Sequence, residues 1–337
     1  MVDMSSSYMG VKLVNPFVVG ACEMTSNLDS IRKMEKAGAG GIVIKSLFEE
    51  QIQLERLRLD DQLTEYDEMH AEMLDIHPTL EHGGPDEYLY WVKQAREAVE
   101  IPVFASLNAV NPETWVEYAK LLENTGVDGL ELNFYLTPVD MNKESKDIEK
   151  EQLETLAAVR KAVSIPLGVK LSPFYANPLN VIKKMDDTGV DGVVVFNRFF
   201  QPDIDVKEEK PSMGFNLSYE GAHKLPLRFS GLLYGNISAD ICASSGIFTG
   251  LDAARLILAG AGSIQVVSAI YRKNIDHLNT MISGLSEWMK DKGYGSLDDL
   301  RGKMSKKNSS DPFAYERAQY VGMLMKPEKI MRNYPRT

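Results

Sequence analysis

Several polar side chains directly follow short apolar segments that are typical of buried strands. Lys45 ends one such segment and Lys170 ends another. An unpaired ammonium group is costly to bury, so each lysine is expected to meet an anionic ligand or a partner. The other polar residues at such ends are Ser46, Ser106, Asn108, Asn133, Ser172, Asn197 and Ser268. Any one serine or asparagine commonly only caps a strand, but the whole set predicts a ligand site.

Two turns rich in small residues predict where a phosphate binds. Residues 243–247 include Ser245 and Gly246, and a later apolar segment ends at Val267 and Ser268. Small side chains allow a ligand to approach the backbone, whose N–H groups bind phosphate. These turns follow the last two expected strands, where α/β barrels bind phosphate, so a phosphorylated ligand is expected.

The elements that carry these residues repeat along the chain. Four segments share a pattern of helix end, glycine turn and apolar strand: 37–45, 125–133, 188–197 and 259–268. Two more strands begin after Ile-Pro, at 101–108 and 165–172, and strands at 16–21 and 240–243 complete a set of eight. Helical stretches separate them; one is expected from Pro112 onwards, with Asn111 as its N-cap.

Eight strands alternating with helices predict an α/β fold, a closed (β/α)8 barrel. No glycine-rich dinucleotide motif follows any of the strands, which disfavours an open doubly wound sheet. Residues 48–90 and 201–230 follow strands and are expected to be long loops at the C-terminal mouth of the barrel. The strand-end residues would converge at that mouth.

Composition narrows the class of protein. The chain has 337 residues and a formal net charge of −11, which disfavours a nucleic-acid partner because phosphate contacts need clustered Lys and Arg. Its first residues lack the apolar core of a signal peptide, and no apolar run reaches the roughly 18 residues of a membrane span. Cys22 and Cys242 are expected to be buried free thiols. We therefore expect a cytoplasmic protein without a membrane partner.

Residues 10–304 resemble the dihydroorotate dehydrogenase family. The segments that carry the resemblance are 11–17, 44–46, 131–133, 166–171, 230–231, 245–247, 267–270 and 293–304, together with Asn197. The resemblance implies a TIM barrel over residues 1–304 that binds flavin mononucleotide (FMN). Residues 305–337 would form a C-terminal extension packed on or beside this barrel.

The family couples hydride transfer to FMN with removal of a proton by a base, and acts in pyrimidine biosynthesis. The resemblance places Lys170 at the N1 side of the flavin, where a cation stabilises reduced flavin, and Lys45 beside the flavin ring and the substrate. The FMN-binding residues that it implies are Ala21, Lys45, Ser46, Asn108, Asn133, Lys170, Asn197, Gly231, Ser245, Gly246, Val267 and Ser268. A small-molecule substrate and a soluble electron acceptor are also implied, and a homodimer is compatible with it.

The sequence departs from the family at the catalytic base. Where the family has a Cys or Ser before a proline, an ungapped comparison gives Leu136, and one inserted residue gives Thr137. Leucine cannot accept a proton, and a threonine hydroxyl needs activation by a neighbour. Thr137 and Lys45 are therefore the candidate catalytic residues. Val139 stands where the family has a substrate-binding asparagine.

The loop between the second and third strands departs as well. The asparagine-rich loop of the family is replaced by residues 73–85, which contain His77 and His82. Either histidine, or Tyr135, could supply the missing base, but solvated loop histidines and a packing tyrosine are at least as common. Asp75, His77 and His82 do not have a recognised metal-site spacing, so no metal is expected.

Three functions remain open. The first is an FMN-dependent oxidoreductase that acts on a CH–CH bond of a small polar ring, with dihydroorotate implied by the resemblance. The second is a flavin-binding paralogue that acts on another substrate or is not catalytic, which Leu136 and Val139 favour. The third is a redox-free lyase in which Lys45 or Lys170 forms a Schiff base.

Overall fold

Eight parallel strands of this protein close into a barrel. The computed structural model describes residues 2–53, 85–109, 111–199, 201–212 and 217–325. In barrel order the strands are β3 (Phe17–Val19), β4 (Gly41–Val43), β6 (Val103–Asn108), β7 (Gly129–Phe134), β8 (Leu167–Leu171), β9 (Gly192–Val195), β12 (Asp240–Ser244) and β13 (Ser263–Val266). The pairing of β13 with β3, in the register Gln265 opposite Val18, closes the ring. The predicted (β/α)8 barrel is confirmed.

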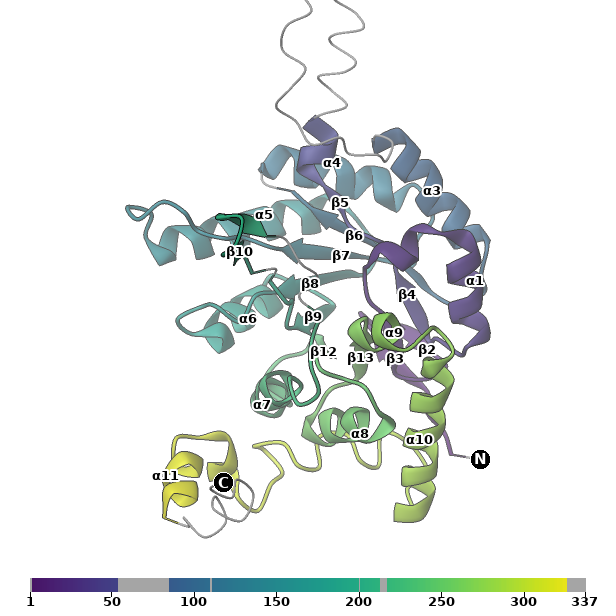
Figure 1. The fold of residues 1–337 in the computed structure, drawn as a ribbon, viewed down its shortest axis with the longest axis vertical. Coiled ribbons are helices and arrows are strands. Elements are labelled where there is room, and N and C mark those ends of the chain that lie inside the picture. Colours follow the sequence, from purple (N-terminus) through teal and green to yellow (C-terminus); the bar gives the residue numbers. More distant parts are fainter. Residues whose placement is uncertain (1, 54–84, 110, 200, 213–216, 326–337) are drawn as a thin grey trace, which may run out of the picture.

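Helices surround this barrel and bury its outer face (Figure 1). They are α1 (Leu28–Lys36), α3 (Pro85–Glu97), α4 (Pro112–Glu123), α5 (Ser145–Ala162), α6 (Pro178–Asp187), α7 (Lys224–Leu233), α8 (Gly250–Ala259), α9 (Ser268–Arg272) and α10 (His277–Lys292). None of the described helices is long and apolar enough to span a membrane.

The repeated Asp-Gly pair before two strands has a structural reason that the sequence pattern did not reveal. The carboxylate of Asp128 accepts the N–H of the first residue of β6 at 2.8 Å and pairs with Arg96 at 2.9 Å. The carboxylate of Asp191 accepts the N–H of the first residue of β8 at 2.8 Å and pairs with Arg160 at 3.0 Å. Each aspartate therefore ties the start of its own strand to the preceding strand and to an outer helix.

A short hairpin, β1 (Ser6–Tyr8) and β2 (Val11–Leu13), packs its turn into the amino end of the barrel. Tyr8 and Met9 are fully buried there, in one cluster with Phe104, Val194 and other interior side chains. A Cβ atom on Gly168 would lie 2.6 Å from Met9 Sδ, and one on Gly192 would lie 2.7 Å from Met9 Cγ. Gly168 and Gly192 thus make room for the turn of this hairpin, because any larger residue would displace Met9.

Two elements within the expected loops were not predicted. The two-residue strand β5 (Leu47–Phe48) extends the sheet at the mouth by pairing with the end of β6, and β10 (Asp203–Asp205) forms a hairpin with β11 (Lys210–Ser212). Asn111 is the N-cap of α4 as predicted, but its side chain does not cap the helix. Instead its backbone N–H donates to Glu49 at 2.8 Å, and its amide also donates to the Glu49 carboxylate.

The segment after residue 304 lies against α7, where it forms the short helices η2 (Pro312–Tyr315) and α11 (Ala318–Leu324), beside α7 in Figure 1. The N–H of Lys306 donates to the carbonyl of Gly231 at 2.9 Å, and Arg228 donates to the carbonyl of Tyr315 at 2.8 Å. The division into a barrel and an extension at residue 304 stays a prediction.

Both cysteines are free thiols, but only Cys242 is fully buried. It lies in the barrel interior, and burial raises the pKa of its thiol to about 12. Cys22 is a free thiol but only half-buried, so the expectation of two buried free thiols is wrong in the burial of this residue. The apolar segment before Cys22 ends at the mouth of the barrel, which brings its side chain to the site described next.

Candidate active site

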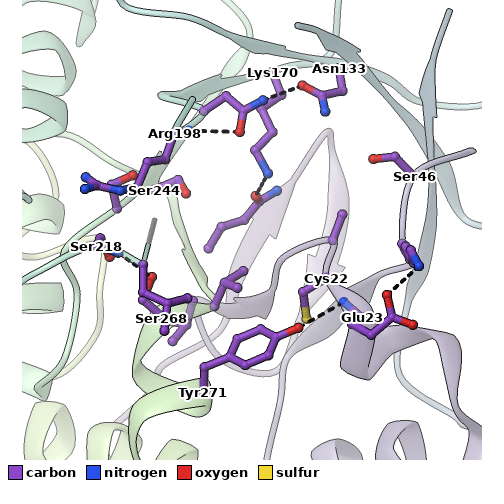
Figure 2. Close-up of a pocket in the computed structure, with 18 of the residues that line it drawn as sticks. Cys22, Glu23, Ser46, Asn133, Lys170, Arg198, Ser218, Ser244, Ser268 and Tyr271 are labelled. Carbon is purple, nitrogen blue, oxygen red and sulfur yellow. Dashed lines mark hydrogen bonds and ion pairs between the residues drawn. The ribbon is translucent and has the colours of Figure 1, made fainter. Parts of the chain in front are cut away.

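A cavity of about 490 Å³ lies at the carboxyl ends of the barrel strands. This volume is within the roughly 300–1,000 Å³ typical of small-molecule and cofactor sites. The described residues that line it include Ala21, Cys22, Glu23, Lys45, Ser46, Phe48, Asn133, Tyr135, Lys170, Asn197, Arg198, Leu217, Ser218, Ser244, Ser245, Gly246, Ile247, Gln265, Val266, Val267, Ser268 and Tyr271. Figure 2 shows most of these side chains around a common space.

The floor of the cavity is a buried polar network beneath Lys170. The Lys170 ammonium donates to Gln265 Oε1 at 3.0 Å and lies 3.6 Å from the carboxylate of Glu131. The amide of Gln265 donates to Glu131 Oε2, and the Tyr8 hydroxyl donates to the same oxygen at 2.5 Å. Lys170 is thus paired with a carboxylate that is itself completely buried. The sequence-based expectation that a buried lysine needs a partner is met by Glu131.

Tyr8 remains protonated in this network. Burial, and then the charge of Glu131, raise the pKa of its hydroxyl well above the ordinary value. A neutral hydroxyl donates to the carboxylate, while the Gln265 side chain connects that carboxylate to the ammonium of Lys170. Breaking a buried ion pair costs about 3–5 kcal/mol, so the network holds the Lys170 ammonium in one position at the floor of the cavity.

The opposite side of the cavity is a cradle of small residues that links three loops. The N–H of Gly246 donates to Ser218 Oγ at 3.0 Å, and the N–H of Ser218 donates to Ser268 Oγ at 2.9 Å. Gly246 has a φ of +71°, and a Cβ atom there would lie 2.4 Å from the backbone nitrogen of His223. Ser245 also has a positive φ of 87°. Only glycine fits at position 246, because its φ is positive and a Cβ atom would clash with the backbone of residues 222–223. The turn can therefore pack closely against this segment and keep its small residues at the cavity.

Two asparagines at the strand ends are bonded to each other. Asn197 Nδ2 donates to Asn133 Oδ1 at 2.7 Å, and Asn197 Oδ1 accepts the N–H of Arg198 at 2.9 Å. This arrangement uses both polar groups of Asn197 within the protein. It presents the amide nitrogen of Asn133 as a donor toward the cavity, next to Lys170 (Figure 2).

The rim near β3 carries a second cation, which is already paired. Lys45 Nζ contacts the carboxylate of Glu23, whose backbone N–H donates to the Tyr271 hydroxyl at 3.2 Å. Burial, and then the charge of Cys22, raise the pKa of Tyr271 to about 12. Burial also raises the pKa of the Cys22 thiol. Tyr271 and Cys22 are therefore neutral near pH 7 and poorly suited to accept a proton from a substrate.

Aromatic side chains cover another part of the rim. The rings of Tyr135 and Phe199 have centroids 4.2 Å apart, and Phe174 packs on Phe199 with centroids 5.6 Å apart. Phe48, which is partly exposed, also lines the cavity. Flat apolar surfaces of this kind suit a planar ligand, because aromatic faces stack with little entropy cost.

The structure brings most of the predicted ligand-binding residues together. Ala21, Lys45, Ser46, Asn133, Lys170, Asn197, Ser245, Gly246, Val267 and Ser268 all line the cavity. Asn108, Gly231 and Thr137 do not line it. Asn108 is buried beside β5, and Gly231 packs on the ring of Tyr315, which a Cβ atom would approach to 2.1 Å. Thr137 is exposed on the loop after β7, as are Leu136 and Val139.

Asp75, His77 and His82 lie outside the residues that the structure describes. Sequence reasoning missed Glu23, Arg198, Ser218, Gln265 and Tyr271 as lining residues. Glu23 had a usable signal, since it is a polar residue just after the end of an apolar strand segment, and Gln265 had another, since it is a polar residue between apolar residues of a strand. Within the described part of the chain, no cluster of three or more His, Cys, Asp or Glu side chains could hold a metal ion.

A parallel barrel with a cofactor-sized polar site at the carboxyl ends of its strands defines the class of α/β-barrel enzymes. Within that class the chain belongs to the dihydroorotate dehydrogenase family, whose model matches residues 3–289. The members of this family to which it is similar are oxidoreductases.

The similarity to individual family members is distant. The chain is 25% identical over 313 residues to the catalytic subunit of dihydroorotate dehydrogenase B (NAD+) of Methanocaldococcus jannaschii, covering 89% of this chain and 97% of that protein. It is 30% identical over 232 residues to the putative dihydroorotate dehydrogenase A (fumarate) of Aeropyrum pernix, covering 66% and 74%. It is 26% identical over 316 residues to the NAD-dependent dihydropyrimidine dehydrogenase subunit PreA of Escherichia coli K12, covering 89% and 76%.

Proposed function

We propose that this chain binds FMN non-covalently and transfers electrons between a CH–CH bond of a small polar ring and a soluble acceptor. The observation that carries the proposal is the position of Lys170. Its ammonium is fixed by Glu131 and Gln265 at the floor of a cavity whose far side is the cradle around Gly246. A cation at one end and a cradle of small residues at the other match the two charged parts of reduced FMN.

The described residues fit this cofactor. Gly246 and Ser245 would hold the phosphate together with Ser218 and Ser268, and Lys170 would face the N1 side of the ring system. FMN, when bound, supplies a two-electron acceptor for hydride. Lys170 then contributes a positive charge where the reduced ring is anionic, and the amide nitrogen of Asn133 can donate to a polar edge of the ligand.

The reaction suggested by the relatives' names needs a base to remove a proton from the substrate, and this chain lacks the family's Cys or Ser at that position. Oxidation of a CH–CH bond removes one hydride and one proton, and the proton needs a base at the substrate. Leu136 and Thr137 are exposed on a loop outside the cavity. This placement supports the second candidate, a flavin-binding paralogue with a substrate other than dihydroorotate. The Schiff-base lyase is disfavoured, since Lys45 and Lys170 each pair with a carboxylate and a Schiff base needs a neutral amine.

The relatives support a soluble electron acceptor. Two of them carry NAD in their names and one carries fumarate. We propose a cytoplasmic enzyme of pyrimidine metabolism or a related pathway, acting as a homodimer or with a partner subunit. The M. jannaschii and E. coli relatives are themselves named as subunits.

The experiment that tests FMN binding compares two ligands that differ only in the phosphate. Flavin-free protein is titrated with FMN and with riboflavin, and binding is followed by quenching of flavin fluorescence. We expect FMN to bind at least about tenfold more tightly, because one charged phosphate contact contributes about 1.5–3 kcal/mol. Gly246→Val should abolish that difference by pushing this turn away from the backbone of residues 222–223 and so displacing the cradle. Equal binding of both flavins by the unaltered protein would contradict the proposed phosphate site.

A further inference from the structure

We propose that His223 positions the backbone N–H of Ile247 to bind the phosphate of the cofactor. This inference rests on the proposed function and assigns the phosphate a donor in the turn that follows β12. His223 directly precedes α7; it is buried and is not one of the described residues that line the cavity. Ile247 lies in the turn and does line the cavity.

The imidazole of His223 holds one carbonyl group of this turn. Its Nδ1 lies 3.2 Å from the carbonyl oxygen of Gly246. A carbonyl oxygen can only accept a hydrogen bond, so Nδ1 carries the hydrogen. The carboxylate of Asp252 lies 3.6 Å from the same Nδ1 and is itself paired with Arg255 at 2.7 Å. His223 is the N-cap residue of α7, but its side chain does not cap that helix. The imidazole therefore serves the turn and not the helix.

The fixed carbonyl determines the direction of the next N–H. The Gly246–Ile247 peptide bond is trans, so the Gly246 carbonyl and the Ile247 N–H point in opposite directions. Because His223 holds the carbonyl outside the cavity, the N–H faces the cavity. Across the described chain this N–H has no hydrogen-bond partner, whereas the N–H of Gly246 already donates to Ser218, on the cradle side in Figure 2. Buried backbone donors are nearly always paired, so an open donor at the cradle suits a ligand.

A second imidazole in the same turn provides a comparison. His277 Nε2 donates to the carbonyl of Phe248 at 2.8 Å. The N–H of that peptide group belongs to Thr249, and it already donates to Asp252 at 3.0 Å. This peptide group therefore has no open donor for a phosphate. Loss of the His223 imidazole should weaken phosphate binding, whereas loss of the His277 imidazole should not.

The experiment compares the binding of FMN and of riboflavin in three variants by quenching of flavin fluorescence. His223→Leu should weaken FMN binding about tenfold, the size of one hydrogen bond to a charged group, and leave riboflavin binding nearly unchanged. His223→Asn should restore most of the FMN affinity, because the Nδ2 donor of asparagine is as many bonds from Cα as the Nδ1 of histidine. His277→Leu is the matched control and should leave the preference for FMN unaltered.

The amide proton of Ile247 gives a second test that does not depend on the folding of a variant at position 223. In nitrogen–proton correlation NMR spectra of the unaltered protein, with the resonance assigned by Ile247→Val, it should move downfield with FMN but not with riboflavin. Such a shift is expected for an N–H that donates to a charged oxygen.

Four results would overturn the inference. They are a preference for FMN that His223→Leu leaves unchanged, an equal loss of preference in His277→Leu, an equal weakening of riboflavin binding in His223→Leu, and an Ile247 resonance that does not respond to the phosphate. Equal binding of both flavins by the unaltered protein would instead reject the proposed phosphate site, so the two failures are distinguishable.

Discussion

Replacing Lys170 by methionine should make the bound flavin harder to reduce. Lys170 is the cation at the cavity floor, and its ammonium lies 3.6 Å from the Glu131 carboxylate. For a cation about 4 Å from the negative charge of reduced flavin, the attraction is about 4 kcal/mol at an effective dielectric constant of about 20. The Glu131 charge, about 7–8 Å from the flavin, opposes this by about 2 kcal/mol.

The state of Glu131 in the variant sets the size of the effect. If Glu131 stays ionised, the full attraction of about 4 kcal/mol is lost; if it takes up a proton, the net loss is about 2 kcal/mol. For a two-electron couple about 1.4 kcal/mol corresponds to 30 mV, so the midpoint potential should fall by about 40–90 mV. The double variant Lys170→Met with Glu131→Gln removes both charges and should lie near the smaller value.

The assay is an anaerobic redox titration of the FMN-loaded protein against dyes of known potential. Lys150→Met, on the outer face of α5, is the control and should leave the potential where it is. The double variant also guards against misfolding, because it leaves no buried carboxylate without a cation. An unchanged potential in both Lys170 variants would refute the placement of this cation beside the flavin.

Two further predictions concern the base and the buried network. Dihydroorotate should reduce the flavin slowly or not at all, because general-base catalysis is worth about 10²–10⁴-fold and no thiol or hydroxyl from residues 136–137 reaches the cavity. In stopped-flow reduction, Leu136→Cys and Thr137→Cys should each leave the rate unchanged, because both positions lie outside the cavity. Rapid reduction of the unaltered protein, or a gain of rate in either variant, would contradict this reasoning. Tyr8→Phe should lower the free energy of unfolding by about 1–3 kcal/mol in urea, because Glu131 loses a buried donor. Because the pKa of Tyr8 is raised in the folded protein, its protonated hydroxyl stabilises the fold fully below about pH 10 and less as the pH rises further. The free energy of unfolding of Tyr8→Phe should therefore fall less above about pH 10 than that of the unaltered protein. Identical pH profiles of the two proteins in this range would contradict the role of Tyr8 as a buried donor.

The strand pattern predicted the barrel because the strands are short apolar runs, four of them preceded by a glycine turn, and the parallel pairing follows from the helices that intervene. The same reasoning placed Lys45, Lys170 and Gly246 at one site, since the carboxyl ends of parallel strands meet at one face. The same reasoning could not identify the carboxylates that pair with Lys170 and Lys45. Glu131 lies within β7 and Glu23 lies one turn after β3, and only the three-dimensional register brings them to Lys170 and Lys45.

Position at a strand end is also an incomplete criterion for a site residue. Asn108 ends β6, but the additional strand β5 pairs alongside it, with Phe48 opposite Asn108, and the asparagine does not reach the cavity. Gly231 is needed for a different reason, since it gives space to the Tyr315 ring. Neither β5 nor the contact with Tyr315 has a local sequence signal, because both depend on how distant segments pack.

FMN binding is tested most directly by the identity and amount of flavin that the protein carries when it is purified without added cofactor. We expect a yellow protein whose spectrum has the two visible-range bands of oxidised flavin, and heat denaturation should release FMN in a ratio approaching one per chain. A colourless protein that does not take up added FMN, or one that releases only a flavin without a phosphate, would show that this chain is not an FMN-binding protein.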